Sequence, residues 1–287
     1  MIQTTVNKFK LYDKEDDGMV SCNLCPHFCI LKEGQTGSCY ALYNKDEELI
    51  HKNNGSISVL AVEPITKKPF RHFLEDSKTL TLGGKGCNLS CHFCENSNIS
   101  QSSPDEKLTV MNPWVLMDIA KQKNCKSISM SYNEPILSYE FLLKLARVCK
   151  INGLKFILKT NAFINKEPWE NICKATDAMN IDWKGSEEKF KQITGVNYYV
   201  LQDRIKEAYD YGVHLEISFP LYYQDDEIEE EINIVGEFLS SIDKEIPCHL
   251  LPIQSSYKYG QFIFKQENLD KAKEILSRYM CNIYSVL

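Results

Sequence analysis

The run TLTLGGKGCNLSCHFCEN, residues 79–96, decides the fold expected for this chain. Residues 79–84 have the pattern of a β-strand, and the chain passes from them straight into a loop that carries Cys87, Cys91 and Cys94. Folds built from βα units place their reactive groups in loops at the carboxyl ends of parallel strands. The run therefore predicts the first strand of a parallel sheet, followed directly by a functional loop.

Strands and helices alternate over the rest of the chain, which is the pattern of repeated βα units around a parallel sheet. Further strands are predicted at 127–133, 154–161, 177–184, 213–219 and 246–253, and helices at 114–124, 136–152, 166–176, 198–211, 226–241 and 266–280. A closed eight-stranded barrel takes about 250 residues, more than follow residue 75. The predicted fold is therefore α/β, a partial (β/α)6 TIM-type barrel over residues 76–287. A Cys-rich amino-terminal metal-binding segment, residues 1–75, precedes it.

The 12 cysteines are the unusual part of the composition. The sequence starts without the apolar stretch of a secretory signal, which predicts a cytoplasmic protein with reduced thiols. Tight cysteine groups in such a protein indicate metal ligands, whereas the scattered Cys125, Cys149, Cys173 and Cys281 are expected to be small buried apolar residues. The net charge of −6 argues against a nucleic-acid partner. No apolar run approaches about 18 residues, so no membrane partner is expected.

Cys87, Cys91 and Cys94 have the spacing C-x3-C-x2-C. Three thiolates can hold a 4Fe–4S cluster and leave one iron without a protein ligand. That iron can bind the amino and carboxylate groups of S-adenosylmethionine (SAM) and deliver an electron to its sulfonium, which breaks the C5′–S bond. A zinc site is the alternative, but zinc normally takes four protein ligands, and His92 or a distant residue would have to supply the fourth.

Phe93 completes a C-x3-C-x-aromatic-C run, and by this motif the sequence resembles the radical SAM superfamily. With VEPITKKPFRHF at 62–73, it resembles the branch of pyruvate formate-lyase activating enzyme, most closely the AmmeMemoRadiSam radical SAM enzymes. SYNEP (131–135), KTNA (159–162) and IDWKG (181–185) match further segments of that branch. The resemblance implies that a set of residues binds SAM or lines its site: Phe93, Tyr132, Asn133, Glu134, Asn161, Asp182 and Lys184.

The resemblance implies an enzyme whose 5′-deoxyadenosyl radical removes a hydrogen atom from a protein or peptide substrate, as in the glycyl-radical activases. A flavodoxin- or ferredoxin-type reductant would supply the electron. Two alternatives stay open: a radical SAM epimerase or other enzyme acting on a small-molecule substrate, and a non-catalytic iron–sulfur or zinc protein. In an epimerase, Cys248 would be the hydrogen donor, although it shares its strand face with Leu250, which favours a packing role.

Lys159 departs from the resemblance. The glycyl-radical activases have an aspartate at the matching position, which helps to hold a monovalent cation near SAM, and a lysine cannot ligate a cation. We expect the ammonium of Lys159 to replace that ion and to pair with Asp182 or the SAM carboxylate. A solvent-facing lysine at the end of a strand is the alternative.

Cys22, Cys25, Cys29 and Cys39 form a second group, C-x2-C-x3-C-x9-C. Four thiolates can close a tetrahedral zinc site or hold a second iron–sulfur cluster. The segment resembles the amino-terminal CxxCPxxC…GxxGxC of the AmmeMemoRadiSam relatives. The sequence predicts a second metal site here and leaves zinc and iron–sulfur open.

Polar residues repeat along one face of three predicted strands: Ser127, Ser129, Ser131 and Asn133; Asn180, Asp182 and Lys184; His214, Glu216 and Ser218. Strands buried on both sides are normally apolar. A polar face therefore indicates either a functional barrel interior or residues that hydrogen-bond to one another. His214 is a candidate contact to SAM or substrate, and a hydrogen bond to Glu216 is the alternative.

Overall fold

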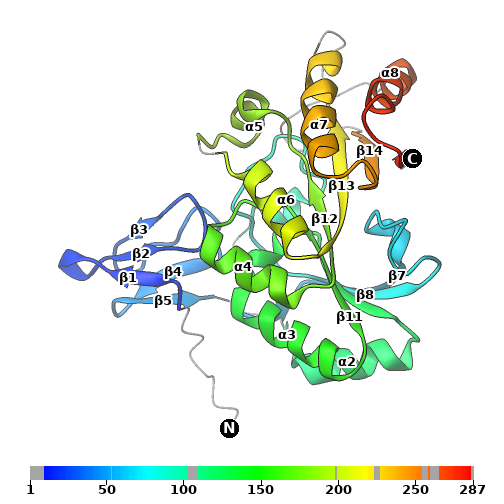
Figure 1. Ribbon diagram of the computed structural model, residues 1–287. Coiled ribbons are helices and arrows are strands. Elements are labelled where there is room, and N and C mark those ends of the chain that lie inside the picture. The colour runs from blue at the N-terminus through cyan, green and yellow to red at the C-terminus, as the bar shows by residue number, and fades with distance from the viewer. Residues whose placement is uncertain are drawn as a thin grey trace.

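An eight-stranded sheet organises the molecule (Figure 1). The computed structural model describes residues 10–52, 54–102, 109–197, 199–222, 227–253, 258 and 265–285. The sheet has the order β15-β14-β13-β12-β11-β10-β8-β7. All six predicted strands are present and parallel: β8 (Lys78–Gly83), β10 (Ser127–Met130), β11 (Lys155–Thr160), β12 (Ala178–Asp182), β13 (His214–Leu221) and β14 (Cys248–Pro252). The predicted α/β class and partial parallel barrel are thus confirmed.

Two strands that the sequence did not predict form the edges of this sheet. β15 (Ile283–Ser285) adds to β14 in parallel, and β7 (Val59–Pro64) pairs with β8 in the antiparallel direction. Exposure alternates along β7, but the outward-facing Leu60 and Val62 are apolar, so the sequence lacks the apolar–polar alternation that identifies a strand. β15 is too short to show a pattern. Because β7 and β15 do not pair with each other, the barrel stays open.

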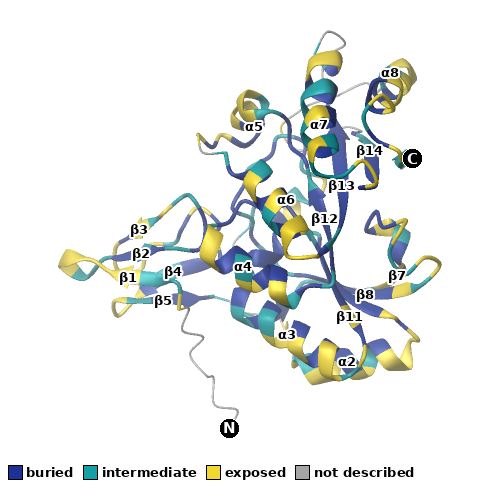
Figure 2. Cartoon of the chain, viewed as in Figure 1, coloured by how far each residue is buried: buried dark blue, intermediate teal, exposed yellow. Residues whose placement is uncertain are grey.

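The helices pack against the outer side of the curved sheet (Figure 1). The predicted ones are present: α2 (Pro113–Gln122), α3 (Tyr139–Ile151), α4 (Lys166–Ala175), α6 (Leu201–Asp210), α7 (Ile228–Ile242) and α8 (Gln266–Leu276). In α3 the buried Leu142, Leu145 and Cys149 recur every three or four residues, so one face meets the sheet. Figure 2 shows the resulting division between buried strands and exposed outer helix faces. No helix in the described ranges is long and apolar enough to cross a membrane.

Two short helices lie in loops where no helix was expected, α1 (Ser97–Ser100) and α5 (Glu187–Thr194). Serine is a preferred N-cap residue, so Ser186 marks the start of α5 in the sequence. In the structure its side chain caps the helix by accepting a hydrogen bond from the N–H of Lys189. Gly195, in the left-handed conformation, ends this helix. α1 follows directly after the cysteine loop.

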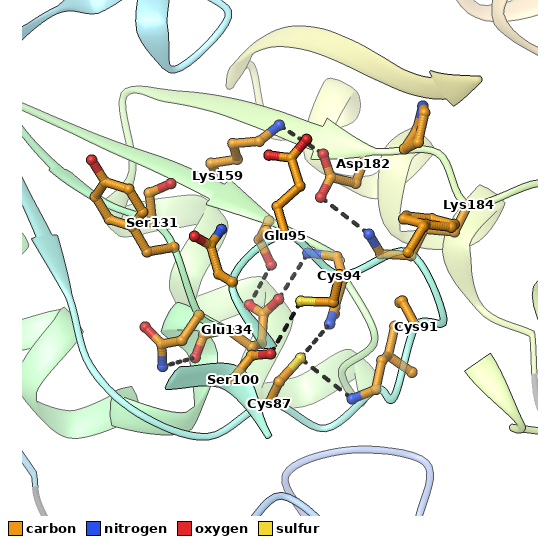
Figure 3. Close-up of a pocket in the computed structure, with 18 of the residues that line it drawn as sticks. Cys87, Cys91, Cys94, Glu95, Ser100, Ser131, Glu134, Lys159, Asp182 and Lys184 are labelled. Carbon is orange, nitrogen blue, oxygen red and sulfur yellow. Dashed lines mark hydrogen bonds and ion pairs between the residues drawn. The ribbon is translucent and has the colours of Figure 1, made fainter. Parts of the chain in front are cut away.

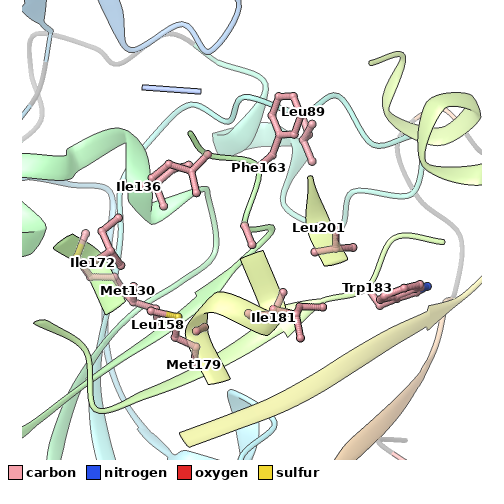
Figure 4. Close-up of a cluster of buried hydrophobic side chains, with 14 of the residues drawn as sticks. Leu89, Met130, Ile136, Leu158, Phe163, Ile172, Met179, Ile181, Trp183 and Leu201 are labelled. Atoms are coloured by element: carbon pink, nitrogen blue, oxygen red, sulfur yellow. The ribbon is translucent and has the colours of Figure 1, made fainter. Parts of the chain in front are cut away.

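A single large cluster of buried side chains fills the space between sheet and helices (Figure 4). Leu158 of β11 and Ile181 of β12 lie in it with Ile172 of α4 and Leu201 of α6. Burying one such side chain stabilises the fold by roughly 1.5–3 kcal/mol. Of the scattered cysteines, Cys125, Cys149 and Cys173 are buried as expected. Cys281 is exposed, contrary to expectation, because it lies in the turn between α8 and β15.

The part of the amino-terminal segment that precedes β7 forms small sheets beside the barrel (Figure 1). One sheet contains β1 (Tyr12–Lys14), β2 (Val20–Cys22) and β3 (Ile30–Leu31); β4 (Leu42–Lys45) pairs with β5 (Glu48–His51) as a hairpin. β6 (Ser56–Ile57) pairs with β9 (Thr109–Val110) from the barrel part. Asn165 fixes the segment further, since its side chain donates to Asn23 O (2.8 Å) and its N–H to Leu24 O (3.0 Å).

The segment after β7 fills the barrel toward the amino ends of the strands. Phe70 is fully buried there. The N–H groups of Arg71 and His72 donate to the carboxylate of Glu216 at 2.9–3.0 Å, and Asn180 donates to Pro69 O at 2.8 Å. This part of the polar interior is therefore occupied by the chain itself.

Candidate functional site

A cavity of about 190 Å³ opens at the carboxyl ends of the strands (Figure 3). Parallel strands end at one edge of the sheet, so the loops that follow them meet there. The cavity is lined by most of the site residues that were predicted from the sequence: Cys87, Cys91, Phe93, Cys94, Tyr132, Asn133, Glu134, Lys159, Asn161, Asp182 and Lys184. Segments 87–96, 131–134, 159–161 and 182–184 are far apart in sequence and are brought together only by the fold.

The three cysteine side chains occupy one part of this wall. The N–H of Leu89 donates to the sulfur of Cys87 at 3.4 Å, and the hydroxyl of Ser100 lies 3.1 Å from the sulfur of Cys94. Burial raises the pKa of the Cys91 thiol to about 11 and that of Cys87 well above its usual value. Buried thiols of this kind become thiolates when a positively charged centre compensates the charge.

The thiols fit an iron–sulfur cluster by donor type and by the space beside them. Three cysteines on one short loop share a cavity that extends well beyond their sulfurs, which is the arrangement that leaves room for a further ligand. Among the described residues, no three His, Cys, Asp or Glu side chains already converge as a finished metal site. Each sulfur has one torsion about its Cα–Cβ bond with which to reach a common centre.

Glu134 lines the cavity and is buried, with 2% of the residue exposed. Its carboxylate accepts hydrogen bonds from Thr160 Oγ1 (2.6 Å) and from the N–H groups of Asn161 (2.8 Å) and Ile136 (3.3 Å). Burial raises the pKa of Glu134 to about 7, while these donors oppose the rise. The group is therefore a fixed acceptor that gains from a cationic partner.

Asn133 has a structural partner that the sequence did not indicate. Its amide oxygen accepts from the N–H of Gly84 (2.8 Å) and its amide nitrogen donates to Gly86 O (3.1 Å). The side chain thus fastens the start of the cysteine loop to the end of β10. Tyr132, just before it, has a positive φ of 73°, and its hydroxyl donates to Glu63 at 2.8 Å.

Asp182 is held between two lysines. Lys159 Nζ lies 2.7 Å from its Oδ1 and Lys184 Nζ 3.1 Å from its Oδ2. Burial alone would raise the pKa of Asp182, but the two ammonium groups outweigh it and hold that pKa at about 2. Burial would lower the pKa of Lys184, and the Asp182 carboxylate with the nearby thiols raises it instead. Asp182 and Lys184 are therefore both charged at neutral pH. The pairing expected between Lys159 and Asp182 is present.

Several residues in or beside the cavity were not predicted. The ring of Tyr222 stacks on that of Phe93, with centroids 4.7 Å apart, and Thr160 and Ser100 bond to Glu134 and Cys94. Thr160 and Ser100 lie inside segments that the sequence singled out, in KTNA and next to the cysteine loop. Tyr222 follows β13, and no motif or pattern in the sequence indicated a role for it.

Two candidate residues do not line the cavity. His214 starts β13, and its Nε2 lies 3.1 Å from the carboxylate of Glu216. This is the hydrogen bond that was the alternative to a contact with SAM or substrate. On β14, His249 faces the same carboxylate at 2.6 Å. Cys248, its neighbour, therefore points to the opposite face of the sheet, where it is fully buried and its thiol bonds to Ile246 O.

Comparison with protein families and sequences gives a consistent result. A family profile described as "Radical SAM superfamily" matches residues 82–235. The chain is 34% identical over 251 residues to the "Uncharacterized protein MJ0808" of Methanocaldococcus jannaschii, a match that covers 86% of this chain and 74% of that protein. It is 22% identical over 213 residues to pyruvate formate-lyase 1-activating enzyme of Escherichia coli K12, covering 68% and 87%.

Solved structures share the fold. SuiB of Streptococcus suis bound to the precursor peptide SuiA superimposes with a TM-score of 0.58 at 18% identity. That match covers 71% of this chain and 47% of SuiB, so the chain spans under half of SuiB. QueE from Escherichia coli superimposes with a TM-score of 0.55 at 14% identity, covering 80% of this chain and 93% of QueE.

Proposed function

Since this chain belongs to the radical SAM superfamily, we propose that it cleaves SAM reductively at a 4Fe–4S cluster and removes a hydrogen atom from a protein or peptide substrate. The observation that carries the proposal is the single cavity in which the three thiols of the C-x3-C-x2-C loop meet Glu134 and Asp182. The family implies the cluster and SAM. The donor types in this cavity suit both.

Cys87, Cys91 and Cys94 would hold the cluster. When bound, the cluster supplies one electron to SAM, which separates into methionine and a 5′-deoxyadenosyl radical. That radical would serve to take a hydrogen atom from the substrate, which would give 5′-deoxyadenosine and a substrate radical. A flavodoxin- or ferredoxin-type reductant provides the electron.

The other residues of the cavity orient SAM. The buried carboxylate of Glu134 suits the α-amino group of the methionine part, because a cation restores the charged form that burial disfavours. Lys184, 5.7 Å above the ring of Phe93 and paired with Asp182, suits the carboxylate. Asn161 lies between Glu134 and Cys87. Its N–H donates to the carboxylate of Glu134, and its side-chain nitrogen lies 3.7 Å from the sulfur of Cys87.

A protein or peptide substrate is favoured by the relatives. Several are named pyruvate formate-lyase activating enzymes, and a structure of SuiB contains a precursor peptide. An epimerase that uses Cys248 as hydrogen donor is less consistent with the geometry, because that thiol lies on the far face of β14. A non-catalytic iron–sulfur protein would have no use for the buried Glu134 and the Lys159–Asp182–Lys184 group beside the thiols.

The test is anaerobic reconstitution with iron and sulfide, followed by dithionite and SAM. We expect release of 5′-deoxyadenosine, and its loss in the triple variant Cys87→Ala, Cys91→Ala, Cys94→Ala. The matched control replaces the three buried cysteines Cys125, Cys149 and Cys173, which lie outside the cavity, by alanine. Equal 5′-deoxyadenosine release from the first variant and the unaltered chain would refute the proposal.

A further inference from the structure

The four amino-terminal cysteines surround one small cavity. Cys22 ends β2, Cys25 and Cys29 lie before β3, and Cys39 lies before β4. They share the cavity with apolar neighbours, Leu24, Phe28, Leu31, Leu42 and Leu137. The N–H of Cys22 donates to Cys29 O at 2.9 Å, which closes the first turn. A methyl group placed on Gly37 would lie 3.7 Å and 3.8 Å from the sulfurs of Cys29 and Cys39, so that turn passes directly beside both.

Backbone N–H groups point at three of these sulfurs in the same way. In each case one donor lies two residues after the cysteine: Leu24 for Cys22, His27 for Cys25 and Ala41 for Cys39, where the N–H of Leu42 is a further donor. The same relation holds in the second cysteine group, between Leu89 and Cys87. Burial raises the pKa of these three thiols, and the N–H donors only oppose that rise. The thiolate, which is the form that binds metals, is therefore favoured here by a cation that compensates its charge.

The backbone beside two of the cysteines is strained. Phe28 precedes Cys29 with a φ of 43°, and Tyr40 follows Cys39 with a φ of 64°. Left-handed conformations cost non-glycine residues about 1–2 kcal/mol. Such strain persists where the surrounding structure enforces it and is concentrated at functional sites. Both residues are also exposed aromatics, so burial of their rings does not account for it.

We propose that Cys22, Cys25, Cys29 and Cys39 bind one zinc ion in a closed site, and that this ion holds the loop that carries Cys87. The cavity measures about 10 Å³, close to the space of a single water. One ion fits there in place of the thiol protons, whereas a cube of iron and sulfide does not. Four sulfurs without an open position are the usual ligands of structural zinc.

Asn88 connects the two cysteine groups. Its side chain donates to the sulfur of Cys25 and to Phe163 O (2.7 Å), and it accepts from the side chain of Asn161 at 3.0 Å. The same Asn161 nitrogen lies 3.7 Å from the sulfur of Cys87. The imidazole of His27 adds a 2.7 Å contact to Asn88 O.

A zinc ion that fixes Cys25 therefore also fixes Asn88, and through Asn161 the position of Cys87. Asn88 acts here as a positioning residue, because it contacts ligands of both groups without being one. This second part of the inference rests on the proposed function, in which Cys87 is a cluster ligand. The zinc site itself does not.

Metal analysis tests the zinc site. In the Cys87→Ala, Cys91→Ala, Cys94→Ala variant, purified anaerobically without added metal, we expect about one zinc per chain and little iron or sulfide. Adding Cys22→Ser and Cys25→Ser should remove the zinc, whereas adding Cys149→Ser and Cys173→Ser should not. About four irons with sulfide, a single iron, or no metal in the folded triple variant would overturn the assignment.

Cluster loading tests the coupling, in a chain that keeps Cys87, Cys91 and Cys94. We expect Asn88→Ala to retain zinc but to take up at least several-fold less iron on reconstitution, and to lose the change that SAM causes in the electron paramagnetic resonance spectrum. Asn171→Ala, which removes a half-buried asparagine hydrogen bond to Tyr139 away from both cysteine groups, is the control. An Asn88→Ala variant with normal iron and a normal response to SAM would refute the coupling. Zinc content is measured in the triple variant, which has no cluster ligands. Failure of the zinc assignment can therefore be distinguished from failure of the proposed function.

Discussion

The ammonium of Lys159 lies 2.7 Å from the carboxylate of Asp182. Asn180 Oδ1 at 2.8 Å and Ser218 Oγ at 3.3 Å complete a set of three oxygens around the same nitrogen. Two of these oxygens belong to β12 and one to β13, so the lysine on β11 reaches both of these strands. Its charge, together with that of Lys184, keeps Asp182 ionised beside the cysteine loop.

Replacing Lys159 should weaken SAM binding. Lys159→Ala removes one of the two cations that hold Asp182, so the pKa of that carboxyl should rise and the oxygens of Asn180 and Ser218 lose their shared donor. We expect SAM affinity to fall by roughly tenfold, about 1.4 kcal/mol, as measured by equilibrium binding. Lys155→Ala, on the same strand but paired with Asp177 at the surface, should leave affinity unchanged. Unchanged affinity and turnover in Lys159→Ala would show that the lysine is dispensable.

Glu216 should make stability depend on pH. Burial alone would raise its pKa, but His214, His249 and the N–H groups of Arg71 and His72 lower it from 4.5 to about 2. A depressed folded-state pKa contributes stability above pH 4.5 that is lost as the pH falls toward 2, on the order of 3 kcal/mol. The free energy of unfolding should thus differ between Glu216→Gln and its parent at neutral pH, and the difference should shrink in acid.

Denaturant titrations at several pH values measure this difference. Both chains should carry the Cys87→Ala, Cys91→Ala and Cys94→Ala substitutions, so that acid release of a cluster does not contribute. Glu237→Gln, on the exposed side of α7, is the control and should show no such trend. A pH-independent difference for Glu216→Gln would mean that its ionisation is not what stabilises the barrel.

A methyl group at Gly86 should disrupt the contact between the two cysteine groups. Gly86 has a φ of 89°, and a Cβ there would lie 2.5 Å from Cys39 O. Gly153 has a similar φ of 70° but nothing within 4 Å. Both alanine variants incur the left-handed strain of about 1–2 kcal/mol, and only Gly86→Ala adds a backbone clash. We expect Gly86→Ala alone to lose iron on reconstitution, and equal iron content in the two would contradict this.

Cys248→Ala should leave SAM cleavage intact. The thiol is buried on the face of β14 opposite Glu216, so its removal leaves only a small cavity. We expect an unchanged rate of 5′-deoxyadenosine formation and a loss of stability of about 1 kcal/mol, similar to that of the buried Cys149→Ala. Loss of product formation with retained SAM cleavage, together with solvent deuterium in the product, would instead support the epimerase alternative.

The central strands and their helices were predictable because each carries a strong local pattern. β11 is a short apolar run, and α3 repeats apolar residues every three or four positions. The edge strands β7 and β15 were not predictable in this way. An edge strand has a neighbour on one side only, and β7 leaves Leu60 and Val62 exposed, so its identity as a strand comes from pairing with β8.

The repeated polar residues of the strands illustrate what sequence leaves open. The pattern indicated a polar interior but not which part of it is available to a ligand. Asn180 and Glu216 are occupied by the backbone of residues 69–72, whereas Asp182 and Lys184 line the open cavity. Ser129 is satisfied by Thr81 at 2.9 Å. Mutual hydrogen bonding therefore accounts for the deeper part of the polar face, and the functional interpretation remains a prediction for the part that lines the cavity.

The sequence alone determined the chemistry that the chain can offer. Cysteine spacing and strand order are local properties, so the two cysteine groups and the alternation of strands and helices are evident from the order of the residues. Only the tertiary structure decided which distant groups meet: Lys159 with Asp182, Glu134 with Thr160, and Asn88 with both Cys25 and Asn161. Such contacts join residues from different strands and loops. They depend on the register of the sheet and the path of each loop, which no local pattern encodes.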